Sequence, residues 1–423
     1  MQTILSSSET LMAQLEATRR ASGQVRRLDD AARLALLQRL ADVVENETDA
    51  ILAANQLDLS RMDPADPKYD RLLLNEPRLT ALANSIREVA ALPGPSGAIL
   101  LERTLENGLK LRKISVPMGV IGIIYESRPN VTLDVTALCL QSGNAAVLRG
   151  GTDAFDTNSI LIRLIQETLE KEGLSRDCVA LLPPDRDLVK TMLTATRHID
   201  LIIPRGSESL IRFVREHSRV PVIETGAGVC HTYVHQAADL EKAKAIVVNA
   251  KVSRPSVCNA LDTILVDTVI APEFLPLLCE DFERWGVEVF ADEQSYSILK
   301  NAGFSRLRPA EPEDFGREFL DFKCSVKTVE DQEEALVHIE KYSSRHSEAI
   351  VSEDQHVCRY FIENVDAAAV YANASTRFTD GGTFGLGAEI GISTQKLHAR
   401  GPFALEKLVT EKWIVEGEGQ VRW

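Results

Sequence analysis

One cysteine of this 423-residue chain lies in a segment that could carry nucleophilic chemistry. Residues 253–259 read SRPSVCN, so Cys258 follows Arg254 by four positions in a polar stretch kinked by a proline. A nearby guanidinium favours the thiolate, which is the form of cysteine that attacks carbonyl carbons. A buried cysteine acting as a small hydrophobic side chain is the commoner case. The segment therefore indicates a nucleophile, with a core thiol as the alternative.

An asparagine is the second residue that could take part in chemistry. Residues 117–132 read PMGVIGIIYESRPNVT, in which an apolar strand runs into a polar turn and Asn130 stands at the start of a helix. Its side chain can cap that helix. It can also donate to a developing oxyanion, where one donor is typically worth about 100- to 1000-fold in rate. We expect the neighbouring Glu126 and Arg128 to pair with each other.

The composition narrows the class of protein. A formal net charge of −15 argues against nucleic-acid binding, because such proteins carry basic surfaces. No apolar run approaches the length of a membrane span, and the polar N-terminus, where Ser6 and Glu9 predict a capping box, lacks a secretory signal. Seven scattered cysteines without a C-x-x-C pair indicate a reduced, cytoplasmic protein. His231 and His235 would share a strand face, but no third ligand is nearby, so we expect no metal site.

Alternating strands and helices must position these residues. Short apolar runs predict strands at 120–125, 145–148, 179–182 and 199–203, with helices at 131–141 and 158–171. A glycine follows each helix as a stop signal, and continuous apolar strands between helices predict a parallel, doubly wound α/β sheet. A second series begins near His231, with strands at 263–266, 287–290 and 349–351. The turn ETGAG at 224–228 is the expected boundary between the two series.

Further blocks extend the pattern around both candidate residues. They read QSGNAAVLRGG at 141–151, NAK at 249–251, NASTRFTDGG at 373–382, FGLGAE at 384–389 and STQKLHARGP at 393–402. With residues 117–132 and 254–259, these blocks closely resemble the γ-glutamyl phosphate reductases, a family of the aldehyde dehydrogenase superfamily that catalyses the second step of proline synthesis. The resemblance runs in a fixed order from position 117 to position 402.

The resemblance implies an aldehyde dehydrogenase-like fold and a specific reaction. Cys258 would displace phosphate from γ-glutamyl phosphate and form a thioester, while Asn130 and the backbone N–H of Cys258 would hold the oxyanion. Hydride from a nicotinamide would reduce the thioester, and collapse of the thiohemiacetal would release L-glutamate 5-semialdehyde. Phosphate is a good leaving group, so this reaction needs no strong general acid.

Three residues at the end of one predicted strand indicate the cofactor. Arg149 stands where a nucleotide ribose normally lies. Gly150 and Gly151 follow it, so no carboxylate is present to repel a 2′-phosphate. This favours NADPH over NADH, with Arg149 as a plain surface cation as the alternative.

The resemblance adds two further cofactor positions. The G-x-G-x-x-G fingerprint is absent, and the dinucleotide would instead bind at Gly206 and Ser207, where a helix N-terminus can hold a phosphate. Ser207 could equally be a simple cap. Glu318 resembles the acid that the superfamily places against the nicotinamide ribose, although an exposed loop glutamate is an even alternative.

A substrate with a carboxylate and a phosphate needs several donors. Arg254, Asn373, Ser375, Thr376 and Arg377 supply them, and the sequence leaves open which donor binds which group. Superfamily members that form free acids place a water-activating glutamate near Glu224. A phosphate-dependent reductase needs none, so we interpret Glu224 as structural or incidental, which leaves open some thioesterase side activity.

The resemblance also implies a domain plan. The cofactor-binding domain would comprise residues 1–99 and 117–228 with part of 372–394, and the catalytic domain 229–371. Segments 100–116 and 395–423 would be arms that pair between subunits of a homo-oligomer, either a dimer or a tetramer. Transient contact with glutamate 5-kinase is a further expectation.

Three other functions compete with this interpretation. A phosphate-independent aldehyde dehydrogenase of the same fold would hydrolyse its thioester with water. A cysteine acyltransferase or hydrolase would need a partner histidine, and no histidine lies in a motif of that type. A non-catalytic binding protein would hold phosphate without turnover.

Overall fold

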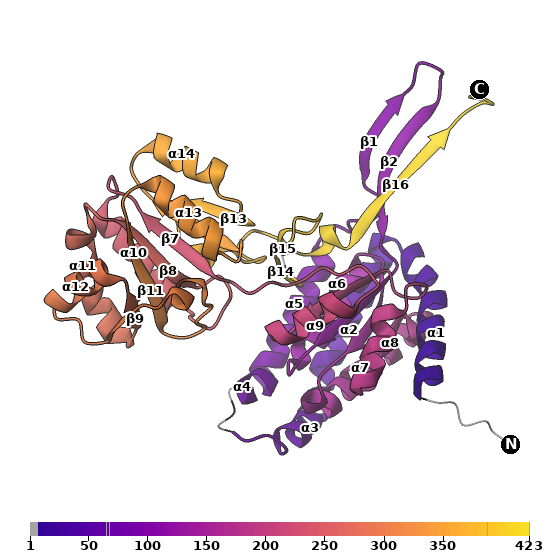
Figure 1. Ribbon diagram of the computed structural model, residues 1–423. Coiled ribbons are helices and arrows are strands. Elements are labelled where there is room, and N and C mark those ends of the chain that lie inside the picture. Colours follow the sequence, from indigo (N-terminus) through magenta and orange to yellow (C-terminus); the bar gives the residue numbers. More distant parts are fainter. Residues whose placement is uncertain (1–6, 65, 67, 387, 423) are drawn as a thin grey trace. The chain divides into compact units, whose positions relative to one another are not determined.

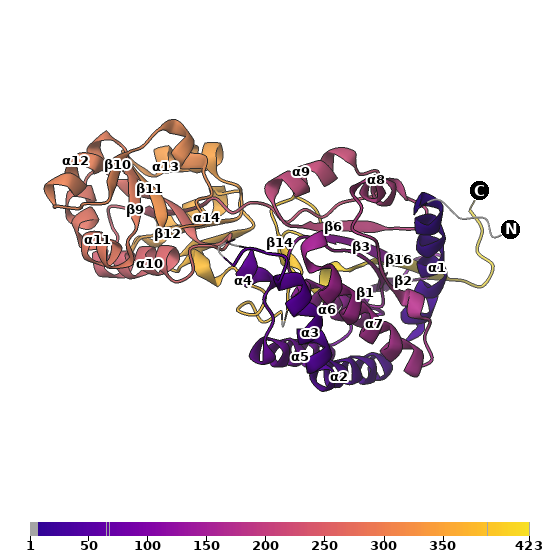
Figure 2. The ribbon, with the colours of Figure 1, turned by 90° about the horizontal axis from the view of Figure 1, so that it is seen from below.

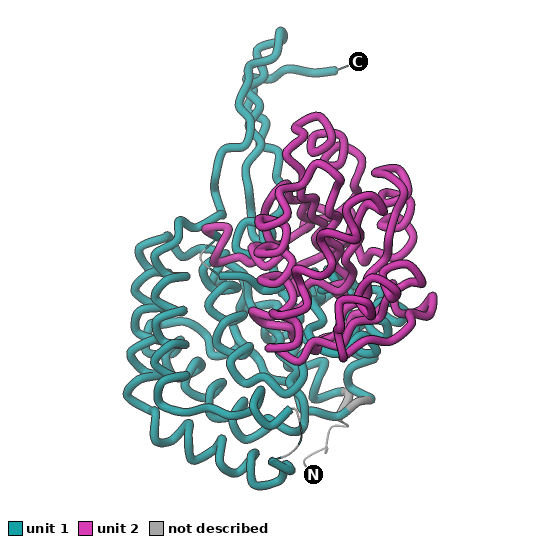
Figure 3. The backbone as a smooth tube through the Cα atoms, turned by 90° about the vertical axis from the view of Figure 1, so that its left-hand side faces the viewer, with its two compact units in different colours: residues 1–225, 386–391, 403–423 teal, residues 226–385, 392–402 magenta. Residues whose placement is uncertain are grey.

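The computed structural model describes residues 7–64, 66, 68–386 and 388–422. It divides into two compact units, which are described separately (Figure 3). Unit 1 comprises residues 1–225, 386–391 and 403–423, and unit 2 comprises residues 226–385 and 392–402. The chain changes unit inside the predicted 224–228 turn. The expected capping box at Ser6 lies outside the described residues.

Unit 1 contains a four-stranded parallel sheet in the order β5-β4-β3-β6. Its strands are β3 (Val120–Tyr125), β4 (Ala145–Arg149), β5 (Val179–Leu181) and β6 (Leu201–Arg205). The strands are almost wholly buried because helices cover both faces. The helices that cover the sheet are α1 (Ser7–Arg27), α6 (Pro129–Gln141), α7 (Phe155–Lys171), α8 (Arg186–Thr194) and α9 (Glu208–His217). Helices α2 (Asp30–Asn46), α3 (Thr48–Leu59) and α5 (Glu76–Ala91) pack against α6 and α7, and α4 (Tyr69–Leu72) packs against α3.

The strand order defines where a ligand can bind in unit 1. The chain passes from β3 to β4 on one side and later places β6 on the other side of β3. Helices α1, α8 and α9 share a core on one face of this sheet, and α6 and α7 lie on the other (Figure 2). Open α/β sheets bind ligands beyond the carboxyl ends of strands at such a reversal. The turns after β3 and β6 meet this condition.

Unit 2 contains a seven-stranded parallel sheet in the order β10-β9-β11-β8-β7-β12-β13. The strands are β7 (Cys230–Val234), β8 (Leu261–Asp267), β9 (Glu288–Ala291), β10 (Leu307–Pro309), β11 (Lys323–Val329), β12 (Ser347–Val351) and β13 (Ala369–Ala372). Helices α10 (Leu240–Val252), α11 (Ala271–Trp285) and α12 (Glu293–Asn301) pack on one face, and α13 (Gln332–Tyr342) and α14 (Gln355–Asn364) pack on the other. The predicted parallel α/β architecture is therefore confirmed, while β10, β11 and β13 were not predicted.

Helix ends in unit 2 follow simple capping chemistry. Aspartate side chains accept first-turn N–H groups at the starts of α10, α12, α13 and α14; these residues are Asp239, Asp292, Asp331 and Asp354. Gly286 ends α11 in the left-handed conformation, with a φ of 70°. These caps fix the helix boundaries, and the turn from α10 into β8 carries Cys258.

A three-stranded antiparallel sheet projects from unit 1 (Figure 1). β2 (Lys110–Pro117) lies between β1 (Ile99–Thr104) and β16 (Val409–Glu416). The C-terminal arm was expected to begin at residue 395, but its strand begins at Val409. Residues 403–405 and 408 are buried instead, and β14 (Gly391–Ser393) pairs with β15 (Gly401–Phe403). Within the described part of the chain, no helix is long and apolar enough to cross a membrane.

Candidate active site

Cys258 lies on the loop between α10 and β8, and its side chain is only partly buried. Cys139, Cys178, Cys230, Cys324 and Cys358 are buried, so Cys258 differs from these core thiols. Cys279, which sits among apolar residues of α11, is also only partly buried. A nucleophile must be reachable by its substrate, and the structure satisfies that condition at Cys258.

The residue after Cys258 anchors this loop to a distant segment. The Asn259 amide donates to the backbone oxygen of Thr379 at 2.8 Å, and the Thr376 hydroxyl donates to the Asn259 backbone oxygen at 2.8 Å. Arg377 donates to the Asn259 side-chain oxygen and, at 3.0 Å, to the Ser253 hydroxyl. Thr376 and Arg377, predicted as substrate donors, therefore hold the nucleophile loop. Asn259 and Thr379 were not singled out from the sequence.

Gly228 packs closely against the backbone of Cys258. A Cβ built on Gly228 would overlap the carbonyl group of Cys258 and would lie 2.6 Å from its Cα. Only a glycine allows this approach. The Cys230 thiol donates to the same carbonyl oxygen, with the sulfur 3.2 Å away. The backbone of Cys258 is therefore fixed from the β7 side.

Glu318 forms a hydrogen bond with Gly228. Its carboxylate accepts the backbone N–H of Gly228 at 2.7 Å, and the residue is partly buried. The alternative of an exposed loop glutamate is therefore wrong. The predicted ribose-binding role of Glu318 stays a prediction.

A buried ion pair supports the segment that carries Glu318. The Lys251 ammonium donates to the backbone oxygens of Asp321 and Lys323, at 3.1 and 2.7 Å. It also lies 3.7 Å from the Asp262 carboxylate, which accepts the Phe319 N–H at 3.1 Å. Burial raises the pKa of Asp262 to about 7, and the Lys251 charge opposes this shift. The only sequence signal for this pair was the NAK block at 249–251.

Two arginines give the loop a local positive charge. Arg254 is exposed, and Arg377 is more enclosed. Burial lowers the pKa of Arg377, and the nearby Arg254 charge lowers it further. Two guanidinium groups close enough to repel each other are suited to an anionic ligand.

Ser375 and Asn373 are already engaged by the backbone. The Ser375 hydroxyl accepts the Arg377 N–H at 3.3 Å. Asn373 has a φ of 56°, and its amide pairs with Ser352 by donating to the backbone oxygen and accepting the N–H, at 2.9 and 3.0 Å. These contacts stabilise the turn after β13, and substrate binding by both residues stays a prediction.

Asn130 lies in unit 1, inside the first turn of α6. The helix begins at Pro129 and its N-cap residue is Arg128, so the alternative that Asn130 is the cap is wrong. The Asn130 amide donates to the Asp134 carboxylate at 3.1 Å. Burial raises the pKa of Asp134 to about 6, and the hydrogen bond from Asn130 opposes the shift. One hydrogen of the Asn130 amide is therefore engaged with Asp134, and this bond orients the Asn130 side chain.

Gly206 and Ser207 form the turn from β6 into α9. Ser207 caps α9 by accepting the Leu210 N–H at 3.4 Å. The Glu126 carboxylate accepts the Ser207 N–H at 2.9 Å and its hydroxyl at 3.1 Å. Glu126 was expected to pair with Arg128, and this contact with Ser207 was not predicted. The N-terminus of α9 therefore already binds the anionic Glu126 carboxylate, and a phosphate-binding site requires the same ability to bind an anion.

Arg149 and the two glycines after it end β4. The Arg149 guanidinium donates to the Pro184 backbone oxygen at 2.6 Å and is partly buried. A Cβ on Gly150 would overlap the Asn158 amide, and one on Gly151 would overlap the Asp153 carboxylate. Packing therefore favours glycine at both positions, and the Asp153 carboxylate lies beside Gly151. The preference for NADPH stays a prediction.

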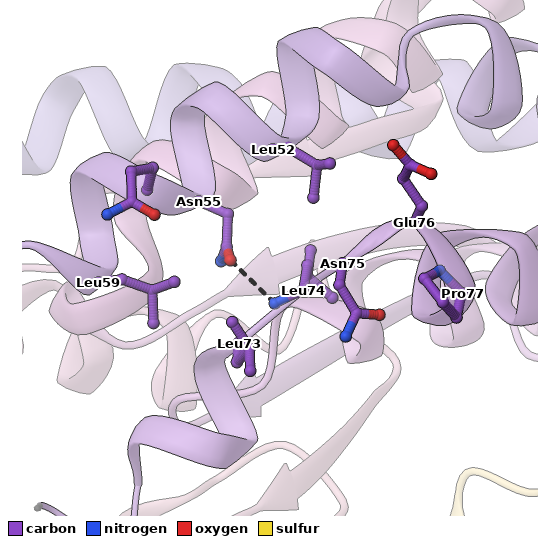
Figure 4. Close-up of a pocket in the computed structure, with 9 residues that line it drawn as sticks. Leu52, Asn55, Leu59, Leu73, Leu74, Asn75, Glu76 and Pro77 are labelled. Carbon is purple, nitrogen blue, oxygen red and sulfur yellow. Dashed lines mark hydrogen bonds between the residues drawn. The ribbon is translucent and has the colours of Figure 1, made fainter. Parts of the chain in front are cut away.

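A separate cavity of about 420 Å³ lies in unit 1 beside α3 and the start of α5 (Figure 4). Among its lining residues, Asn55 accepts the Leu74 N–H at 2.9 Å and donates to the Leu72 backbone oxygen at 2.9 Å. None of the predicted site residues lines this cavity. Within the described residues, no group of three or more His, Cys, Asp or Glu side chains is placed to hold a metal ion.

Known proteins resemble this chain over its length. The model of the aldehyde dehydrogenase family matches residues 2–297. A γ-glutamyl phosphate reductase from Chlorobaculum parvum is 56% identical over 415 residues, covering 98% of this chain and 99% of the relative. One from Legionella pneumophila is 51% identical over 410 residues, covering 97% and 98%.

Solved structures give the same result. The crystal structure of γ-glutamyl phosphate reductase from Thermotoga maritima matches with a TM-score of 0.94 and 40% identity, covering 98% of this chain and 100% of that one. An acetylating aldehyde dehydrogenase from Geobacillus thermoglucosidasius matches with a TM-score of 0.71 at 17% identity, which supports the fold alone.

Proposed function

The chain belongs to the aldehyde dehydrogenase family and, within it, to the γ-glutamyl phosphate reductases, and we propose on this premise that it reduces γ-glutamyl phosphate to L-glutamate 5-semialdehyde. Phosphate leaves in this reaction, which is the second step of proline biosynthesis from glutamate. The observation that carries the proposal is Cys258, a partly exposed thiol on an anchored loop, in a chain 56% identical to a reductase of this name.

Cys258 is the nucleophile of the proposed mechanism. Its thiolate attacks the acyl carbon, the carbon–oxygen bond to phosphate breaks, and a thioester remains on the sulfur. The carbonyl oxygen becomes negative during this attack, and the Asn130 amide and the Cys258 N–H are the proposed donors to it. Phosphate departs as an anion, so the mechanism requires no strong general acid.

A nicotinamide cofactor serves this family, and NADPH is the form proposed for this chain. When bound, it supplies the hydride that brings the acyl carbon to the oxidation level of an aldehyde. Gly206 and Ser207 would hold its phosphates, and the contact of Ser207 with the Glu126 carboxylate supports an anion seat there. Arg149 would bind the 2′-phosphate, and Glu318 the nicotinamide ribose.

The substrate is a small molecule with two anionic groups. Arg254 and Arg377 are its proposed partners, because their charges lie close together beside the nucleophile loop. Thr376 would act mainly by holding Asn259, and Ser375 and Asn373 would contribute through the turn geometry.

Assembly and location complete the proposal. The exposed edges of β1 and β16 would pair with a second subunit in a homo-oligomer, since unpaired edge strands are ready templates for strand addition. Transient contact with glutamate 5-kinase and a cytoplasmic location stay predictions from the sequence.

A phosphate-independent aldehyde dehydrogenase is the second candidate function. It would need a carboxylate that activates water, and Glu224 is the residue in question. Glu224 lies 3.6 Å from the Arg215 guanidinium, and this ion pair suits a structural role.

The test is the reverse reaction, followed as NADP⁺ reduction with pyrroline-5-carboxylate in buffers with and without phosphate. We expect turnover that requires phosphate, is faster with NADP⁺ than with NAD⁺ and is lost in Cys258→Ser. Cys279→Ser, at the other partly exposed cysteine, is the matched control and should keep full activity. Equal oxidation without phosphate would support the second candidate, and full turnover of Cys258→Ser would refute the nucleophile.

A further inference from the structure

A second cysteine lies directly behind the proposed nucleophile. Cys230 begins β7, its side chain is fully buried, and its sulfur is 3.2 Å from the Cys258 carbonyl oxygen. Cys230 and Cys258 are 28 positions apart, so the fold and not the local sequence brings them together. Gly228, which lies just before β7, packs against the same carbonyl group.

We propose that Cys230 is a positioning residue, whose S–H holds the Cys258 carbonyl so that the nucleophile and its backbone N–H keep a fixed orientation. The proposal rests on the proposed function of Cys258. A hydrogen bond from sulfur is weak, and its effect is therefore expected in the placement of the reacting group more than in global stability.

The surroundings keep Cys230 in the form that can donate. Burial raises the pKa of this thiol well above its ordinary range, so it carries its proton at neutral pH. Nδ1 of His346 lies 3.9 Å from the sulfur, and burial lowers the pKa of His346 to about 4. A neutral imidazole does not favour a thiolate at Cys230.

A buried polar chain links Cys230 to the other side of the nucleophile loop. His346 Nδ1 bonds the Ser347 hydroxyl at 2.8 Å, and this hydroxyl bonds the Thr379 hydroxyl at 2.7 Å. The Thr379 backbone oxygen then accepts the Asn259 amide at 2.8 Å. Cys258 is thus held by Cys230 of β7, and Asn259 is held by Thr379 of the 376–379 turn. Both contacts belong to one hydrogen-bond network.

The alternative is that Cys230 merely fills space, as a buried cysteine often does. Cys324 on β11 provides a control for that role, because it is also fully buried in unit 2 and packs in an apolar cluster. A space-filling cysteine tolerates alanine at least as well as serine. A donor cysteine should tolerate serine better, because the hydroxyl restores a donor.

The experiment compares Cys230→Ala and Cys230→Ser with Cys324→Ala and Cys324→Ser in the full-length protein. We expect Cys230→Ala to lower kcat of phosphate-dependent NADP⁺ reduction about tenfold, with KM for pyrroline-5-carboxylate changed less than about twofold. Cys230→Ser should recover to within about threefold of the parent. The rate of Cys258 alkylation by iodoacetamide, followed by mass spectrometry, should change in the same order. Both Cys324 variants should match the parent in these measurements.

Equal activity and alkylation in Cys230→Ala and the parent would overturn the proposal, as would equal losses in the alanine and serine variants. If Cys230→Ala does not fold in a melting experiment, Cys230→Val and Cys230→Thr give the same comparison at nearly equal volume. A parent without phosphate-dependent turnover would refute the proposed function instead, and the alkylation rates would still decide the role of Cys230.

Discussion

The backbone N–H of Gly228 donates to the Glu318 carboxylate at 2.7 Å, across 90 positions of sequence. Gly228 also touches the carbonyl of Cys258, so one residue connects the predicted ribose ligand to the predicted nucleophile. Small displacements of Gly228 should therefore be felt at both residues.

Gly228→Ala tests this coupling. The added Cβ would overlap backbone atoms of Cys258, which cannot move aside as a flexible side chain can. We expect kcat to fall at least ~100-fold, because misplacement of a reacting group by about 1 Å has an effect of this size. Gly23→Ala in α1 is the control, since its Cβ would meet only the Arg27 guanidinium at 3.4 Å. It should leave kcat unchanged and stabilise the helix by up to ~1 kcal/mol. Parent-like kcat in Gly228→Ala would contradict this geometry.

Asn130→Ala tests the oxyanion donor. Removing one donor should lower kcat about 100- to 1000-fold, with substrate KM changed little, because the charge develops only in the transition state. Steady-state kinetics of NADP⁺ reduction provide the measurement. Asn364→Ala is a matched control, because its amide donates to the Tyr360 backbone oxygen on the exposed side of α14. A loss of less than about tenfold in Asn130→Ala would argue against the oxyanion role.

Glu126→Gln tests the anion seat at the start of α9. The Glu126 carboxylate occupies the Ser207 N–H, which a cofactor phosphate would also need. Neutralising this carboxylate should lower the Kd of NADP⁺ by roughly two- to tenfold, since a charge at a helix N-terminus is worth about 0.3–1 kcal/mol or somewhat more. Fluorescence titration measures the Kd. Glu208→Gln, an exposed acid in the same first turn, should change it less than twofold. Weaker NADP⁺ binding by Glu126→Gln would contradict this prediction and would show that the carboxylate favours cofactor binding.

Asp134→Asn tests a pH-dependent contribution to stability. Burial raises the pKa of Asp134 in the folded state to about 6, above the ordinary value of 3.8. The folded state therefore binds this proton more tightly, and stability falls as pH rises from about 4 to about 6. Because Asp134 keeps some contact with solvent, we expect a cost on the order of 1 kcal/mol at neutral pH, less than the full shift would give.

The neutral asparagine should remove that cost. Asp134→Asn should be more stable than the parent at pH 7 to 8 and equally stable near pH 4, as measured by denaturant unfolding across this range. Other titrating groups, such as Asp262, cancel in the difference between the two proteins. Parallel stability curves over the whole range would show that Asp134 does not titrate abnormally.

Local sequence patterns were sufficient for all four strands of the unit 1 sheet, but they missed β10, β11 and β13 of the unit 2 sheet. The apolar runs of β3 and β4 stand out because every residue in them is apolar or glycine until the end of the strand. β11 was missed because Ser325 is polar yet buried, with its hydroxyl 2.8 Å from that of Thr263 on β8. A buried polar residue that forms its hydrogen bond with a neighbouring strand cannot be told from a surface residue in the sequence alone.

The sequence by itself determined the alternation of strands and helices, the family and the identity of the reactive candidates Cys258 and Asn130, because periodicity and motif spacing are local properties. Only the tertiary structure decided which atoms those residues face. The contacts of Glu318 with Gly228, Glu126 with Ser207 and Cys230 with Cys258 join positions 28 to 90 residues apart. Such partners are selected by packing, which brings buried polar groups within hydrogen-bonding distance only after the strands have taken their order.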